Sequence, residues 1–257
     1  MPQRVFDLSQ PYFPGMPHFP THPPFLFGLT KLHGEVVGPN GMSSAADSIA
    51  FSGHCGTHID ALGHFSCAGF VYGEAAVKQS YTGGLESHDA ASIEPIVRRG
   101  VLLDVARTRG VRALEVQDEV TAADLDRACS AHRITIEPGD VVMMRLGWGH
   151  FFDDAKRYVN GGTMPGVNLE AAKWLSEHRV FAAGSDTLAF EKLPNPAMSV
   201  HVHLLVEQGI HLIENLQLEE LSTAQAYEFQ IVAAPLKIRG GTGAPVRPLA
   251  LVEKQQE

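Results

Sequence analysis

In the second half of the chain, short apolar runs alternate with amphipathic stretches. The apolar runs are rich in branched residues and have the length of buried strands. They lie at residues 100–105, 140–144, 180–183, 209–213 and 229–235. Helical patterns lie between them at 121–132, which opens with a Thr-Ala-Ala-Asp cap, at 168–177, and at 199–207, which Gly209 ends. The alternation predicts an α/β fold with a buried sheet and flanking helices.

The first 25 residues follow a different pattern. Prolines recur in Pro11-Tyr-Phe-Pro-Gly-Met-Pro-His-Phe-Pro20 and exclude a helix or an interior strand there. We expect an ordered, extended arm. Its phenylalanines would be costly to expose to water, so the arm should pack on the body of the protein or on a neighbouring subunit. These phenylalanines are Phe13, Phe19, Phe25 and Phe27.

Nothing in the sequence divides the chain into two units. No Gly/Ser-rich linker, charge run or internal repeat interrupts it, so we predict one domain over residues 1–257. Apolar residues make up 44% and charged residues 19% of the chain, which is typical of a globular protein with a sizeable core.

Charge and hydropathy narrow the choice of partners. The formal net charge is -9, and no basic stripe is present to neutralise phosphates, so we expect no nucleic-acid partner. The absence of long apolar runs and of an export signal predicts a cytoplasmic protein that does not span a membrane. Cys55, Cys67 and Cys129 are too few for a disulfide framework and are expected to be reduced thiols.

The candidate chemistry concentrates in one segment, His54-Cys-Gly-Thr-His58-Ile-Asp60-Ala-Leu-Gly-His64. Its two glycines, Gly53 directly before it and two β-branched residues disfavour a helix, so an extended, kinked segment is expected. Alternate residues of an extended chain share a face, and the three histidines and the aspartate all occupy even positions. Imidazoles and a carboxylate gathered in this way suit Zn, Mn or Fe(II), with positions left for water and substrate. The alternative is ordinary hydrogen bonding of these histidines to the backbone.

This segment resembles the H-x-G-T-H-x-D-x-x-x-H signature of the cyclase-like metal-dependent hydrolases, which include bacterial kynurenine formamidases and isatin hydrolases. Segments at 7–11 and 235–247 are also similar to the family, so the resemblance spans essentially the whole chain. It implies the family's swivelling β/β/α fold, with a mixed buried sheet and flanking helices. It also implies that His54, His58 and Asp60 bind metal, that Asp60 is able to bridge two ions, and that His64 is the catalytic acid/base.

The resemblance implies a second group of ligands downstream. Family members with two metals take further ligands from segments similar to those that contain His201 and Glu214. Helical spacing independently favours His201 over His203, because Leu204 and Leu205 follow it by three and four residues. The glutamate indicates two ions, whereas the glycine-rich C-terminal segment is close to the pattern of isatin hydrolases, which manage with one.

We therefore expect a metal-dependent amidohydrolase that holds one or two Zn or Mn ions per chain. Its substrate would be a small aromatic or cyclic amide, of the aryl formamide, isatin or lactam type. Phe65 and Trp148 are candidate substrate contacts, because aromatic side chains suit an apolar ligand. The aromatic arm and the resemblance together predict a homo-oligomer, either a dimer or a tetramer. Three alternatives stay open: a lactone or ester hydrolase, a metal-binding module without catalysis, and a cysteine hydrolase that uses Cys55.

Overall fold

The computed structural model of the chain describes residues 3–253. Residues 1–2 and 254–257, the two ends of the predicted domain, lie outside the described residues. Nine strands form one sheet in the order β1-β17-β15-β9-β11-β13-β14-β4-β16. Their bounds are Gln3–Asp7 (β1), His58–Asp60 (β4), Ile96–Asp104 (β9), Val141–Arg145 (β11), Ala182–Ser185 (β13), His211–Glu214 (β14), Glu228–Ala233 (β15), Gly243–Pro245 (β16) and Leu249–Glu253 (β17).

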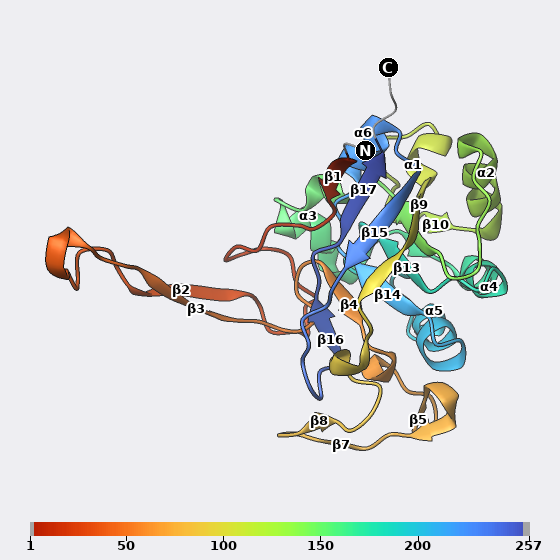
Figure 1. Cartoon of the computed structure of the whole chain (residues 1–257). Coiled ribbons are helices and arrows are strands. Elements are labelled where there is room, and N and C mark those ends of the chain that lie inside the picture. Colours follow the sequence, from red (N-terminus) through yellow and green to blue (C-terminus); the bar gives the residue numbers. More distant parts are fainter. Residues whose placement is uncertain (1–2, 254–257) are drawn as a thin grey trace.

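The centre of this sheet is parallel and its two sides are antiparallel. Strands β9, β11, β13 and β14 run parallel, and helices connect them in sequence (Figure 1). Every residue of β11 is buried, and its side chains alternate between two cores. Val142 and Met144 pack in the core on one face, whereas Val141 and Met143 pack in the core on the other. Burial on both faces explains why the central strands are continuous apolar runs.

Helices α2, α4 and α5 cover one face of the sheet. Residues of α2, α4 and α5 belong to the same hydrophobic core, and α5 continues as a π-helical segment, Val202–Glu207 (Figure 1). Within residues 3–253, no helix has the length and apolar character needed to cross a membrane. The helices are Val105–Thr108 (α1), Ala122–His132 (α2), Ala155–Val159 (α3), Leu169–Glu177 (α4), Ser199–His201 (α5) and Glu219–Ala224 (α6).

The predicted α/β class is confirmed, and so is the mixed sheet with flanking helices. All five predicted strands and all three predicted helices are present, the third with π geometry in its second part. Strands β1, β16 and β17 were not predicted, whereas β4 lies within the segment that was predicted to be extended and kinked. The remaining strands form small two-stranded sheets: Leu26–Lys31 (β2), Ala46–Ala50 (β3), Phe70–Val71 (β5), Ala75–Ala76 (β6), Gln79–Ser80 (β7), Gly84–Leu85 (β8), Glu119–Val120 (β10) and Gly166–Val167 (β12).

The N-terminal segment differs in part from the prediction. Residues 3–7 are the edge strand β1, which the prolines permit because none lies between Pro2 and Pro11. As expected, Phe13 and Phe19 pack against a core and Phe25 is buried. Phe27 does not pack: it is 48% exposed on β2. Strands β2 and β3 form an arm of residues 26–50 that projects away from the body of the protein (Figure 1).

Helix α2 carries the predicted cap. The Thr121 hydroxyl accepts from the Asp124 backbone N–H, while the Asp124 carboxylate accepts from the Thr121 backbone N–H at 2.9 Å. Arg109 donates to the same carboxylate, with Nε 3.0 Å from Oδ1. Burial would raise the Asp124 pKa, but these hydrogen bonds outweigh it and hold the pKa below its usual range. The carboxylate therefore stabilises the fold when it is ionised.

Asp124→Ala should lower the free energy of unfolding by about 1–2 kcal/mol at neutral pH, a typical value for loss of a cap. The folded-state pKa is depressed, so the stabilisation is fully present above the unfolded pKa of about 3.9 and is lost as the pH falls from there through the lower folded-state pKa. Urea unfolding at neutral and acidic pH measures both effects. Glu177→Ala, at an exposed residue of α4, is the control. Equal losses of unfolding free energy in the two variants would contradict the stabilising role of the Asp124 carboxylate.

Candidate metal centre

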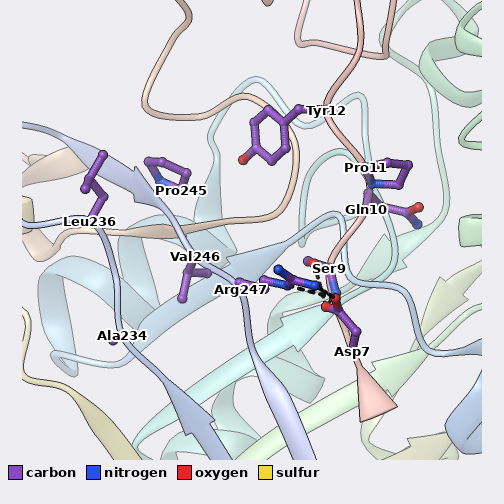
Figure 2. A pocket seen from close by; sticks show the side chains of 10 residues that line it. All are labelled: Asp7, Ser9, Gln10, Pro11, Tyr12, Ala234, Leu236, Pro245, Val246 and Arg247. Atoms are coloured by element: carbon purple, nitrogen blue, oxygen red, sulfur yellow. Dashed lines mark hydrogen bonds and ion pairs between the residues drawn. The ribbon is translucent and has the colours of Figure 1, made fainter. Parts of the chain in front are cut away.

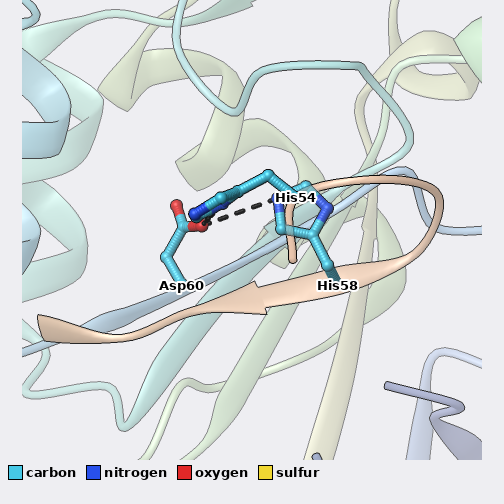
Figure 3. A group of neighbouring side chains, drawn as sticks. All are labelled: His54, His58 and Asp60. Carbon is cyan, nitrogen blue, oxygen red and sulfur yellow. Dashed lines mark ion pairs between the residues drawn. The ribbon is translucent and has the colours of Figure 1, made fainter. Parts of the chain in front are cut away.

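Strand β4 carries the centre of the candidate site. His58 and Asp60 are alternate residues of β4, so their side chains lie on the same face (Figure 3). His54 lies in the turn before the strand, and its Nδ1 is 2.8 Å from Asp60 Oδ1. Glu214 ends the neighbouring strand β14, where the antiparallel register places it opposite His58. The sheet therefore joins two segments that are far apart in the sequence.

The five predicted ligand residues come together as two buried triads. The first triad is His54, His58 and Asp60, and the second is Asp60, His201 and Glu214. Within each, one candidate ligand atom per residue lies within 4.8 Å of the others. His201 Nε2 is 3.3 Å from Glu214 Oε1, and His58 Nε2 is 3.4 Å from Glu214 Oε2. Asp60 belongs to both triads, which is the arrangement that a bridging carboxylate requires.

Buried polar atoms that lack a hydrogen-bond partner indicate whether the triads suit a metal ion. His58 Nε2 and both carboxylate oxygens of Asp60 are buried and make no hydrogen bond of good geometry with the described residues, although His54 is close. His58 Nδ1 is 2.8 Å from the Gly56 carbonyl oxygen, which only accepts, so Nδ1 is a donor there and Nε2 is the nitrogen that faces the triad. Unpartnered buried polar atoms cost about 1–3 kcal/mol each. A divalent metal ion fits this donor set and would remove that cost.

The carboxylates of the two triads are ionised at neutral pH. Burial would raise the pKa of Glu214, but His201 and His58 lower it to about 2. Burial likewise opposes ionisation of Asp60, and the interactions with His64, His54 and His58 hold its pKa well below the usual range. Two buried negative charges beside imidazole nitrogens favour a cation.

His64 stands beside the triads without belonging to either. It ends the 3-10 helix Leu62–His64, and its ring centroid lies 3.9 Å from that of His54. Burial, assisted by His54 and His201, lowers the His64 pKa to about 3. The imidazole is therefore neutral at physiological pH and has a nitrogen that is able to accept a proton.

A small cavity opens on the triads. Its volume is about 120 Å³, and it combines aromatic and aliphatic walls with the imidazoles and the Glu214 carboxylate. The residues that line it are Phe19, His22, His54, His64, Phe65, Leu188, Ala189, Met198, His201 and Glu214. Phe65 thus lies where a substrate contact was predicted. Its ring is 4.8 Å from both the His64 ring and the His201 ring.

Trp148 does not lie where it was predicted. It is not among the residues that line this cavity, and only 4% of its surface is exposed. Its indole N–H donates to the Tyr158 carbonyl at 3.1 Å, and its ring packs in a core with Phe152. Because the N–H is already used and the ring is enclosed, Trp148 is a packing residue in this structure.

Cys55 is likewise a packing residue. It is fully buried in the same core as Trp148, and burial raises the pKa of its thiol to about 11. A protonated, inaccessible thiol is not an activated nucleophile, so the cysteine hydrolase alternative has no support.

Two residues near the cluster were missed by sequence reasoning. His22, from the N-terminal segment, lines the cavity with its ring centroid 5.3 Å from that of His54. Glu191 is fully buried and contacts His201. Neither stands in a motif, and only the folded chain brings them to the site.

A larger cavity, of about 630 Å³, lies between the N-terminal segment and residues 234–247 (Figure 2). It contains no histidine or cysteine. Its oppositely charged side chains, Asp7 and Arg247, neutralise each other at 2.7 Å. This cavity is larger, but it lacks a cluster of metal-binding or proton-transferring side chains. The smaller cavity has such a cluster and is the candidate active site.

Known proteins resemble this chain over most of its length. A kynurenine formamidase of Bacillus cereus is 25% identical over 243 residues, which cover 94% of each chain. An isatin hydrolase of Roseibium aggregatum is 26% identical over 209 residues, covering 78% of this chain and 72% of that one. A crystal structure described as a novel cyclase superposes with a TM-score of 0.89 at 28% identity, covering 96% of this chain and 86% of that chain.

The family assignment follows from the matched range. The model of the family described as putative cyclase matches residues 6–192, which include the whole first triad and His64. His201 and Glu214 lie beyond the match, and their place beside Asp60 in the structure is what links them to the site. The match covers well over half of the chain and contains the first triad and His64, and this protein belongs to the putative cyclase family.

Proposed function

We propose that this protein is a metal-dependent hydrolase that cleaves the C–N bond of a small aromatic or cyclic amide. One observation carries the proposal: two buried triads of imidazole and carboxylate share Asp60, with the neutral His64 beside them. Similarity to a kynurenine formamidase and to an isatin hydrolase supports it, since both names denote enzymes that hydrolyse a C–N bond next to a carbonyl.

The proposed cofactor is Zn or Mn, with two ions per chain. The first triad would hold one ion and the second triad the other, with Asp60 between them. Imidazole and carboxylate donors suit both metals. Once bound, such ions supply a water of lowered pKa and polarise the substrate carbonyl.

The protein's own residues would move protons and shape the cavity. His64 would take a proton from the attacking water and return it to the leaving nitrogen, because its neutral ring is not committed to either triad. Phe65 and Phe19 would contact the apolar part of the substrate. A cavity of about 120 Å³ is of the size that accommodates a single aromatic ring.

A substrate panel tests the reaction type. The purified protein, loaded with Mn or Zn, would be given an N-formyl aryl amide, isatin, a simple lactam, a lactone and an aryl ester. We expect turnover of one of the first three compounds. Turnover of the lactone or the ester alone would favour that alternative at the same site, and bound metal without any turnover would favour the non-catalytic module.

We also propose that residues 1–257 work as one catalytic domain, within a homo-oligomer. Strands from both ends of the chain, β1 and β17, pair in the sheet that carries the triads. The arm of residues 26–50 argues for oligomerisation. All but one of its strand residues are exposed, with Phe27 at 48%, Leu29 at 54% and Ile49 at 54%. An isolated two-stranded hairpin is marginally stable in water, and its apolar residues would be buried against a second copy of this chain.

The double variant Phe27→Glu, Leu29→Glu should therefore lower the molecular mass of the assembly in solution. Light scattering coupled to gel filtration measures this mass. Val97→Glu is the matched control, since Val97 is 60% exposed on β9 in the body of the protein. A wild-type monomer, or an unchanged mass in the double variant, would refute the role of the arm.

A further inference from the structure

Glu191 is a fully buried carboxylate that contacts the second triad from outside it. It lies between β13 and α5, and none of its surface is exposed. Backbone pairing fixes its position, because the N–H of Val167 donates to the Phe190 carbonyl and the N–H of Lys192 donates to the Val167 carbonyl. A side chain at Gly166 would collide with the Glu191 backbone, so this close approach requires glycine.

Both oxygens of Glu191 accept hydrogen bonds. Its Oε2 accepts from the His201 backbone N–H at 3.1 Å and also contacts His201 Nδ1 at hydrogen-bond distance. Its Oε1 accepts from Asn195 Nδ2 at 2.7 Å. Three donors therefore converge on one buried carboxylate, and two of the three belong to His201.

This contact determines which nitrogen of His201 faces the triad. With Nδ1 directed at Glu191, Nε2 points to Glu214 Oε1 at 3.3 Å. The Glu191 oxygen accepts in this contact, so Nδ1 donates its proton there and Nε2 is the nitrogen that faces the second triad. The equivalent nitrogen of His58 faces a neutral acceptor, the Gly56 carbonyl. The imidazoles of the two triads thus differ in their outer contact: a backbone carbonyl lies behind His58, and a side-chain carboxylate lies behind His201.

We infer that Glu191 is a positioning residue that holds the ring of His201 with Nε2 toward the second triad and strengthens binding of the ion there. The inference rests on the proposed two-metal function. A carboxylate behind a metal-binding imidazole orients the ring and raises its basicity, and its loss typically weakens metal binding roughly 10- to 100-fold. Glu191 would make no contact with substrate, since it does not line the cavity.

Glu191→Gln tests this role, because it keeps the size of the side chain and removes its charge. Metal-free protein would be titrated with Mn²⁺, and bound ions per chain would be counted alongside kcat and KM. At a free Mn²⁺ concentration that gives wild type two ions, we expect one ion in the variant, held by the first triad. Binding of the second ion should shift to roughly 10- to 100-fold higher Mn²⁺, and kcat should recover there.

Glu207→Gln is a matched control from the same region of the chain. Glu207 also binds a histidine nitrogen, His203 Nδ1 at 2.7 Å, but the pair does not line the cavity. This variant should bind two ions as wild type does. Thermal unfolding of each variant separates lost metal from a lost fold, and Glu191→Ala provides a second, larger perturbation.

Two results would overturn the role of Glu191. One is wild-type binding of the second ion in both Glu191→Gln and Glu191→Ala. The other is loss of both ions together from a variant that unfolds at the wild-type temperature. Failure of wild type to bind any Mn²⁺ or Zn²⁺ would instead overturn the proposed function, and the role of Glu191 with it.

Discussion

Asp60→Asn is expected to remove both metal ions and to reduce hydrolysis to the background rate. Asp60 is the residue that the two triads share, and its two oxygens are buried without a hydrogen bond of good geometry. An asparagine in its place has no charge and presents one oxygen, so both triads lose their common carboxylate. Elemental analysis of the purified variant measures the ions per chain, and a substrate assay measures turnover.

The matched control for this variant is Asp140→Asn. Asp140 is also buried, at 2% exposure, but it pairs with Arg99 at 2.8 Å. It should retain both ions even if its stability falls. An Asp60→Asn protein that still holds two ions and hydrolyses amide would show that Asp60 does not bridge the triads.

His64→Ala should lower kcat by about 10²- to 10⁴-fold, the usual effect of removing a positioned acid/base. Metal content should stay at the wild-type value, because His64 belongs to neither triad. Steady-state kinetics and elemental analysis of the same preparation separate the two effects. Loss of metal would make His64 a ligand, and full activity would remove it from the mechanism.

The control for His64 is His203→Ala. His203 is more deeply buried than His64, at 8% exposure, but it bonds to Ser176 and Glu207 instead of facing the cavity. We expect wild-type kcat from this variant. A similar loss in both variants would indicate a general effect of histidine replacement on the fold.

Local pattern was sufficient to predict the first triad and the central strands. His58 and Asp60 converge because they are alternate residues of a strand, which spacing alone reveals. The parallel strands are buried on both faces and therefore appear as continuous apolar runs. Helix α2 begins at a capping box that is visible as Thr121 and Asp124.

Features that depend on long-range pairing could not be predicted in this way. The extended conformation of the segment around His58 was predicted, but its pairing as β4 between β14 and β16 was not. Glu191 stands in no motif and reaches His201 only through the backbone bridge to Val167. The sequence could not separate the two roles open to Trp148, because burial in a core and contact with a substrate favour the same aromatic residue.

The most direct test of the two-metal hydrolase is to count metal ions and measure amide hydrolysis before and after chelation. We predict about two ions per chain in the active wild-type protein. Hydrolysis of an N-formyl aryl amide or of isatin should be lost on complete removal of metal and restored by Mn²⁺ or Zn²⁺. Undiminished hydrolysis by the metal-free protein would contradict the account.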